Sequence, residues 1–194
     1  MKIIDTGDSL FEETFRRISG RGRVFDAEIW QTVREIVDDV VRRGDAALFA
    51  YTKRFDQTDL DTASVEVSAS EWKDAAARVP QEDMAVLQLA CRRIEAFHQR
   101  QVTPSWSYTD EAGVELGQRV LPLEKIGIYA PGGLAAYPST VLMAAIPAKI
   151  AGVAEILLVS PVKGGILHPL IAAAAKLGGV TRIFKIGGAQ AIAA

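Results

Sequence analysis

The sequence predicts an α/β protein in which a charged, helical N-terminal segment precedes a parallel sheet. Within residues 1–105, apolar residues recur at helical spacing among many charges, whereas residues 126–194 repeat a strand–turn–helix unit three times. The strands of these units are short runs rich in isoleucine, leucine and valine, which is typical of parallel strands buried on both faces. We expect the crossover connections between them to be right-handed.

The helical N-terminal segment contains clear start and stop signals. Ser9 and Glu12 form a capping-box pattern, which predicts a helix that ends at Gly20. Asp26 is expected to cap a longer helix that ends at Gly44. The other elements predicted here are a helix at 45–52, a strand at 64–67 and helices at 70–79 and 81–98.

A predicted hairpin separates this segment from the repeated units. Two alternating stretches, 106–109 and 114–121, flank the turn DEAG. The units that follow have predicted strands at 126–130, 155–160 and 182–186, with helices at 138–151 and 167–177 and a third helix that begins after GGAQ.

Glycine-rich turns follow all three predicted strands, at 129–133, 160–165 and 187–190. Ligands of such sheets bind at the carboxyl ends of the strands, where glycine admits a close approach and helix N-termini favour anions. Glycines that serve tight turn geometry alone would give the same pattern, so both interpretations remain open. Tyr129 and Gln190 are placed to stack on a ligand or to form hydrogen bonds with it. The dinucleotide pattern G-x-G-x-x-G is absent and no acid ends the second strand, so a nucleotide would bind in an atypical way.

Composition limits the classes of partner. The net charge of the 194 residues is −2, which favours neither nucleic acid nor an anionic membrane surface. Five basic residues and one acid follow residue 127, so this part carries +4 and residues 1–127 carry −6. The basic part suits an anionic ligand, although solvated surface lysines would explain it equally well.

Few residues of this sequence could bind a metal ion or act as a nucleophile. Cys91 is the only cysteine, which excludes an intramolecular disulfide, and its helical spacing predicts core packing. His98 and His168 fall at a helix end and a helix start, so we expect structural roles for both. No signal-peptide core is present at the N-terminus, and the apolar region 141–162 is broken by charges and prolines, so a cytoplasmic protein without a membrane span is expected.

Three blocks of the sequence resemble the histidinol dehydrogenase family. They are RRGDAALFAYTKRFD (42–56), IGIYAPGGLAAYPSTVLMAAIPAKIAGV (126–153) and AAAAKLGGVTRIFKIGGAQAIAA (172–194). The middle block is the most specific, because related zinc enzymes that act on other amino or sulfonated alcohols tend to lack its AAYPS…IPAK form. The resemblance covers essentially the whole chain and corresponds to the N-terminal part of the family.

The resemblance implies a chemistry. Members of the family oxidise L-histidinol through L-histidinal to L-histidine, with two molecules of NAD in turn and one zinc ion that orients and polarises the substrate. By motif match, Tyr129 and Gln190 are the expected NAD contacts, and an asparagine further along is a third. The family's zinc ligands and its Glu–His acid–base pair are expected downstream of Ala194, so we expect no catalytic and no metal-binding residue in this chain.

The resemblance also implies an architecture of two incomplete Rossmann-like domains and an intertwined homodimer. Residues 1–20 would form an N-terminal helical arm, residues 21–125 the first segment of domain one, and residues 126–194 a truncated NAD-contacting domain. A partial first domain is expected to expose apolar surface. Two alternatives remain: a short nucleotide-binding or oligomerising module without catalysis, and a fragment of a related zinc- and NAD-dependent alcohol dehydrogenase. The ending AIAA in mid-helix favours a truncated enzyme over the module.

Overall fold

The computed structural model describes residues 4–20, 27–132 and 136–194 of the chain. The N-terminal part consists of helices α1 (Phe11–Ser19), α2 (Ala27–Arg43), α3 (Asp45–Asp56), α4 (Ala69–Ala77) and α5 (Gln81–His98), followed by a short 3₁₀ turn, η2 (Gln99–Gln101). The hairpin is formed by β1 (Trp106–Thr109) and β2 (Glu115–Gln118). The repeated units comprise β3 (Lys125–Tyr129), α6 (Pro138–Ala151), β4 (Glu155–Val159), α7 (Pro169–Gly178), β5 (Arg182–Phe184) and α8 (Gly188–Ala193).

The centre of the fold is a parallel sheet with the strand order β3-β4-β5. Ile128 lies beside Leu158, and Leu158 lies beside Ile183, so these three side chains share one face and are buried there. The residues that alternate with them point to the opposite face. The structure confirms the predicted α/β class and the predicted parallel strands.

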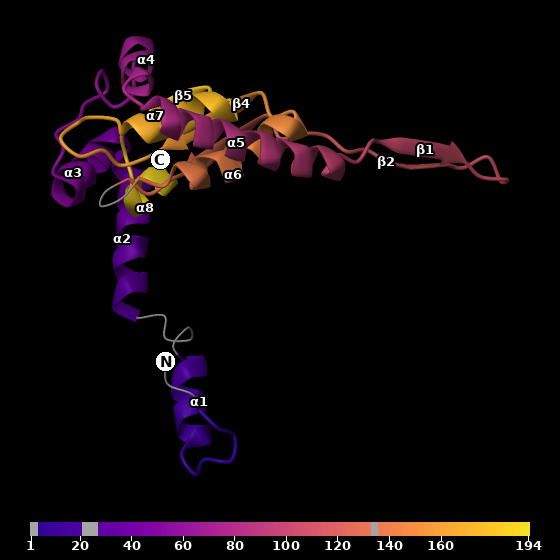
Figure 1. Ribbon diagram of the computed structural model, residues 1–194, viewed down its shortest axis with the longest axis horizontal. Coiled ribbons are helices and arrows are strands. Elements are labelled where there is room, and N and C mark those ends of the chain that lie inside the picture. The colour runs from indigo at the N-terminus through magenta and orange to yellow at the C-terminus, as the bar shows by residue number, and fades with distance from the viewer. Residues whose placement is uncertain (1–3, 21–26, 133–135) are drawn as a thin grey trace.

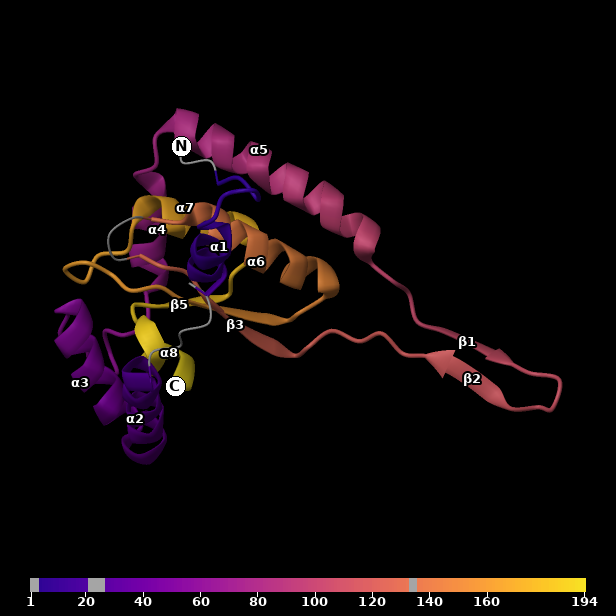
Figure 2. The ribbon, with the colours of Figure 1, turned by 90° about the horizontal axis from the view of Figure 1, so that it is seen from below.

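One face of the sheet is covered by α6 and α7, with α4 and α5 packed outside them (Figure 2). The contact between α6 and α7 is close, because a Cβ atom on Gly178 would lie 2.8 Å from the Cβ of Ala145. The indole Nε1 of Trp72 donates a hydrogen bond of 2.8 Å to the carbonyl oxygen of Ala172, which attaches α4 to α7. This face therefore holds the main core of the molecule.

The opposite face carries a smaller core. Leu48 of α3 packs with Leu60, Ile186 and Ala191 of α8, and Val159 and Phe184 from the sheet lie against them. Figure 2 shows α2, α3 and α8 on the side of the sheet that is remote from α6 and α7. The two groups of helices give the fold three layers.

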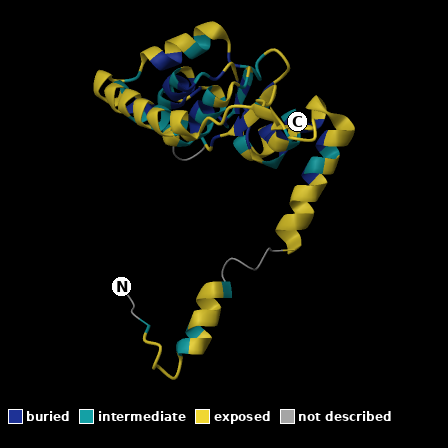
Figure 3. Cartoon of the chain, turned by 90° about the vertical axis from the view of Figure 1, so that its right-hand side faces the viewer, coloured by how far each residue is buried: buried dark blue, intermediate teal, exposed yellow. Residues whose placement is uncertain are grey.

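Two parts of the chain lie away from this body. The β1–β2 hairpin projects as an arm, and α1 lies beyond α2 (Figure 1). All residues of β1 and β2 are exposed, including the stacked rings of Trp106 and Tyr108, and α1 buries none of its residues (Figure 3). Apolar side chains are thus exposed on both of these parts, among them Phe15 of α1 and Trp106 of β1.

Some predicted boundaries were wrong. Helix α1 begins after Leu10 with no side-chain cap, and Asp8 instead accepts a hydrogen bond from the Leu10 N–H, so the Ser9–Glu12 capping box does not form. The predicted cap Asp26 lies outside the described residues. Helix α3 continues past Thr52 to Asp56, and the rings of Tyr51 and Phe55 stack one turn apart along this extension.

The strand predicted at 64–67 is reduced to a single antiparallel bridge between Glu66 and Phe184. The Val67 N–H donates to the Ile183 carbonyl oxygen at 2.9 Å, and the Lys185 N–H donates to that of Val65 at 2.8 Å. This segment therefore occupies the outer edge of β5.

Ion pairs join the acidic and basic parts of the chain. Arg182 forms two hydrogen bonds with Glu66, of 2.7 and 2.8 Å. Lys185, which is buried, lies 3.2 Å from Glu71. A third pair joins Lys149 to a glutamate of α5. Three of the five cations after residue 127 thus bind acids of the N-terminal part, which leaves few of them for an anionic ligand.

We expect the Arg182–Glu66 pair to make stability depend on pH. The hydrogen bonds from Arg182 lower the pKa of Glu66, so the pair stabilises the fold at neutral pH and loses this effect as the pH falls through the lowered pKa. Because both side chains are partly exposed, Glu66→Gln should reduce the free energy of unfolding at pH 7 by about 1 kcal/mol or less. Urea titrations at pH 7 and pH 3 measure this, and the difference between the two proteins should be smaller at pH 3 than at pH 7. A change of the same size in Glu111→Gln, at the exposed hairpin turn, would contradict the prediction.

Overpacking between α6 and α7 should destabilise the main core. Ala145 is fully buried against Gly178, so Ala145→Leu has no room and should cost about 1–3 kcal/mol. Thermal unfolding followed by circular dichroism measures the loss. Ala151→Leu, at the exposed end of the same helix, is the matched control and should change stability little. Equal effects of the two substitutions would show that the α6–α7 contact is not tight.

Candidate functional site

The turns after β3, β4 and β5 meet at the carboxyl edge of the sheet. A Cβ atom on Gly132 would lie 2.4 Å from the carbonyl oxygen of Pro161, and one on Gly187 would lie 2.7 Å from the Cγ of the same proline. No larger residue fits at either position. These two glycines therefore allow the three turns to pack around Pro161, which supports the geometric interpretation of the glycine-rich turns. Gly133 lies outside the described residues.

Tyr129 is the last residue of β3, and its side chain is 38% exposed. It pairs with Val159 across the sheet, and the following N–H, that of Ala130, donates to the Val159 carbonyl oxygen at 3.0 Å. The backbone at Tyr129 is thus fixed by the sheet while its ring borders a cavity of about 720 Å³. A fixed, half-exposed aromatic ring at a strand end is suited to stacking on a planar ligand.

Gln190 lies in the first turn of α8 and is only 1% exposed. Its amide folds back toward the helix start, since a Cβ atom on Gly188 would lie 2.6 Å from Oε1. Its Nε2 atom is buried and, within the described residues, has no hydrogen-bond partner. An unpaired buried donor is costly, so this amide is a candidate for a ligand contact.

The structure places Tyr129 and Gln190 at the same edge of the sheet but not in the same cavity. The residues that line the cavity beside Tyr129 include Ala191 and Ile192, the neighbours of Gln190, and not Gln190 itself. A second cavity, of about 380 Å³, lies among the turns and is lined by Gly132, Ser160, Lys163 and His168, among others. Among the described residues, Lys163 contributes a positive charge to the lining of this cavity.

The end of α3 also reaches this edge, which the sequence did not indicate. The Thr58 hydroxyl donates to the Val162 carbonyl oxygen at 3.2 Å and so attaches α3 to the turn after β4. One carboxylate oxygen of Asp56 is buried and unpaired within the described residues, and burial raises the pKa of this group. Only the tertiary fold brings these residues to the turn, because about a hundred residues separate them in sequence.

The histidines and the cysteine have structural surroundings. The Nδ1 of His168 accepts a hydrogen bond of 3.2 Å from the Leu170 N–H and caps α7, while that of His98 lies 2.5 Å from the Gln101 side-chain oxygen. Burial raises the pKa of the Cys91 thiol, which disfavours the nucleophilic thiolate. In the described ranges, no three His, Cys, Asp or Glu side chains gather as a metal site requires. The residues at hand therefore do not fit a zinc ion.

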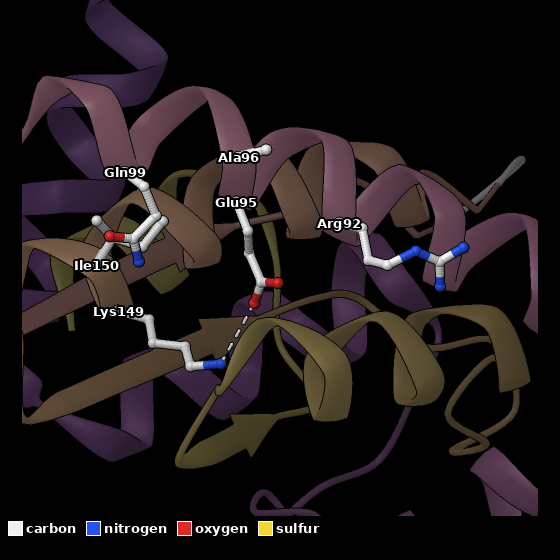
Figure 4. Close-up of a pocket in the computed structure, with 6 residues that line it drawn as sticks. All are labelled: Arg92, Glu95, Ala96, Gln99, Lys149 and Ile150. Carbon is white, nitrogen blue, oxygen red and sulfur yellow. Dashed lines mark ion pairs between the residues drawn. The ribbon is translucent and has the colours of Figure 1, made fainter.

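A further groove lies between α5 and α6. Figure 4 shows Lys149 in an ion pair with Glu95, at 3.5 Å, while Arg92 points away from both. The last turn of α6 precedes β4, so this groove lies at the amino edge of the sheet. It is remote from the turns at which ligands of parallel sheets bind.

Known proteins share both the sequence and the fold. A family model described as "Histidinol dehydrogenase" matches residues 20–194. The histidinol dehydrogenase of Syntrophotalea carbinolica is 53% identical over 194 residues, and that of Geobacter metallireducens is 47% identical over 195. Each match covers all of this chain and 45% of the relative.

A crystal structure of histidinol dehydrogenase from Elizabethkingia anophelis superimposes with a TM-score of 0.78 at 38% identity. It covers 85% of this chain and 38% of that one. The chain thus spans less than half the length of the relatives it matches. Among the described residues, no helix combines the length and hydropathy needed to cross a lipid bilayer. Because the family match extends from residue 20 to the last residue, and the fold agrees with that of a solved member, this chain belongs to the histidinol dehydrogenase family and corresponds to its N-terminal portion.

Proposed function

We propose that this chain is the N-terminal portion of a zinc- and NAD-dependent histidinol dehydrogenase. The parent enzyme would oxidise L-histidinol, through L-histidinal, to L-histidine with two molecules of NAD. The observation that carries this proposal is the 53% identity to a histidinol dehydrogenase over the whole chain. The parent would act in the cytoplasm as a homodimer, without a nucleic-acid or membrane partner.

Within the parent enzyme, we assign Tyr129 and Gln190 to the binding of NAD. Three observations support this assignment: the carboxyl-edge position of both residues, the half-exposed ring of Tyr129 and the unpaired Nε2 of Gln190. Tyr129 would stack on a ring of the dinucleotide, and Gln190 would donate a hydrogen bond to it after a small outward movement. NAD supplies the hydride acceptor when it is bound, and the role of this chain is to hold it.

The catalytic centre itself would come from other parts of the parent enzyme. We place the zinc ligands and the Glu–His pair downstream of Ala194. The family resemblance is the reason for this placement, and the chain covers 45% of the length of the Syntrophotalea carbinolica relative. In this proposal the chain supplies one wall of the cofactor site and none of the acid–base chemistry.

Removal of the Tyr129 ring should weaken NAD binding. Stacking on an aromatic side chain contributes about 1–3 kcal/mol, so Tyr129→Ala should raise the dissociation constant of NAD about tenfold, and Tyr129→Phe should restore most of the affinity. Isothermal titration of the purified chain with NAD measures both values. Tyr108→Ala removes an exposed tyrosine from the hairpin and should leave binding unchanged. Unaltered affinity in Tyr129→Ala would remove this residue from the proposed site.

The chain alone should not oxidise L-histidinol. With NAD and zinc supplied, the absorbance of NADH at 340 nm should not rise above that of a blank without protein, because no described residues form the catalytic centre. Clear turnover by the purified chain would refute the proposed division of roles. NAD binding without turnover would be compatible with a nucleotide-binding module, and complementation of a strain that lacks histidinol dehydrogenase by the full-length gene would decide between the two.

A further inference from the structure

Helices α3 and α8 carry three buried polar atoms that lack a hydrogen-bond partner within the described residues. They are Oγ1 of Thr52, Oδ2 of Asp56 and Nε2 of Gln190. The side chains of Thr52 and Gln190 are almost completely buried, whereas Asp56 is partly buried. A buried polar atom without a partner is unfavourable, and native folds contain few of them. Each of the three atoms therefore needs a partner that explains its position.

Thr52 and Asp56 lie on the face of α3 that is turned toward α8. Residues four apart in a helix lie one above the other, so these two side chains are neighbours, one turn apart. Leu48 precedes them by one turn on the same face, and it belongs to the smaller core that includes Ala191 of α8. Helices α3 and α8 are in contact (Figure 2). The two polar side chains thus continue the face of α3 that packs on α8.

The chain after α3 returns to the turns at the carboxyl edge of the sheet. Gln57 ends the helix in the left-handed region, with a φ of 51°, and the Thr58 hydroxyl then donates to the Val162 carbonyl oxygen at 3.2 Å. The neighbouring residue, Pro161, packs on Gly187 at the start of α8. The end of α3 and the start of α8 therefore meet at the same turn.

These contacts place the three polar side chains in one region. Along α3, Thr52 and Asp56 follow the contact of Leu48 and precede the contact with the turn after β4. Along α8, Gln190 lies between the glycine that packs on this turn and Ala191, which belongs to the smaller core. The two helices are joined at both ends of this interval, so the three unpaired groups lie between them.

The three groups are complementary as hydrogen-bonding partners. An ionised carboxylate only accepts hydrogen bonds, whereas the amide nitrogen of glutamine carries two N–H donors and a threonine hydroxyl both donates and accepts. The acceptor of Asp56 thus matches the donor of Gln190, and the hydroxyl of Thr52 can bond to either. Where such atoms do not touch, one buried water with about three polar partners completes the group.

The cations closest to Asp56 in sequence have other partners. Lys53 forms an ion pair of 2.7 Å with Asp59, and the guanidinium of Arg54 lies over the ring of Phe55, 5.1 Å from its centroid. Burial raises the pKa of Asp56, which is the shift expected of a carboxyl that no cation stabilises. A neutral N–H donor is therefore the kind of partner that this carboxylate requires.

We propose that Asp56 is a positioning residue for Gln190. Its carboxylate accepts a hydrogen bond from one N–H of the Gln190 amide, either directly or through one water molecule that Thr52 also binds. This pairing fixes the amide at the start of α8 and leaves its second N–H for a ligand at the carboxyl edge. The pairing needs no ligand, whereas its consequence for NAD rests on the proposed function.

A double-mutant cycle on the purified chain tests the pairing without NAD. Asp56→Leu and Gln190→Met replace the two groups by apolar side chains of similar size, and each alone leaves the other group buried without its partner. Each should raise the equilibrium constant of unfolding about tenfold, and the double variant should raise it about tenfold or less instead of about a hundredfold. Urea titration measures all four constants. Stabilisation by Gln190→Met, or independent effects of the two changes, would overturn the proposal.

Asp59→Leu is the matched control. It removes an exposed carboxylate three residues after Asp56, with the same change of charge. Its effect should be independent of Gln190→Met. Coupling as large as that of Asp56→Leu would show that the net charge, and not a contact, links the two sites, and would also overturn the pairing.

The side-chain amide of Gln190 provides a second measurement in the folded chain. Nuclear magnetic resonance of the nitrogen-15-labelled protein should show one Gln190 N–H that exchanges slowly with solvent, and Gln190→Met assigns this signal by removing it. Asp56→Leu should shift the signal and speed its exchange, whereas Asp59→Leu should leave both unchanged. An unchanged signal in Asp56→Leu would contradict the pairing.

Isothermal titration with NAD tests the positioning role separately. Asp56→Leu should weaken NAD binding about as much as Gln190→Met does, and it should have no further effect when Gln190 is already replaced. Equal weakening by Asp56→Leu in both backgrounds would overturn the positioning role. If Gln190→Met leaves NAD affinity unchanged, the proposed cofactor contact fails, and the double-mutant cycle still decides whether Asp56 and Gln190 pair.

Discussion

The parallel pairing of β3, β4 and β5 requires apolar cover on both faces of the sheet, and the rest of the structure depends on how this requirement is met. On one face, Ile128, Leu158 and Ile183 are sealed beneath α6 and α7. On the other face, Tyr129, Val159 and Phe184 alternate with them. A smaller cluster that includes Leu48 of α3, Leu60 and Ala191 of α8 packs against Val159 and Phe184 there. The same alternation that builds the core therefore exposes an apolar surface wherever the second layer is incomplete.

Ion pairs join the N-terminal part of the chain to the part that forms this sheet. The acidic N-terminal part and the basic part after residue 127 meet through Glu66 with Arg182 and Glu71 with Lys185. Glu66 lies within the segment that bonds to the outer edge of β5 and Glu71 lies shortly after it, so both pairs help to hold this segment at that edge. In the sequence alone, the excess of basic residues after residue 127 suits an anionic ligand. In the structure, three of these five cations instead pair with acids of the N-terminal part. Among the described residues, Lys163 is a cation that lines the cavity between the turns.

Patterns within one element could be predicted from the sequence, and relations between elements could not. Apolar runs bounded by glycine identified β3, β4 and β5, because strand periodicity is a local property. The capping box at Ser9 did not form because Asp8 accepts the hydrogen bond from the Leu10 N–H at the helix start. The hydrogen bond from Thr58 to the turn after β4 joins residues that lie 104 apart in sequence, and no local pattern records such a contact.

Packing alone explains some features of the candidate site and leaves others unexplained. Close packing of the turns around Pro161 explains Gly132 and Gly187 without a ligand, so these glycines alone say little about binding. Tyr129 and Gln190 are different, because neither an exposed ring at a fixed strand end nor an unpaired buried amide is favourable in the chain by itself. Both are explained if a ligand lies at this edge. Tyr129 ends β3 and Gln190 lies in the first turn of the helix that follows β5, so both lie at the carboxyl edge, where parallel sheets bind their ligands.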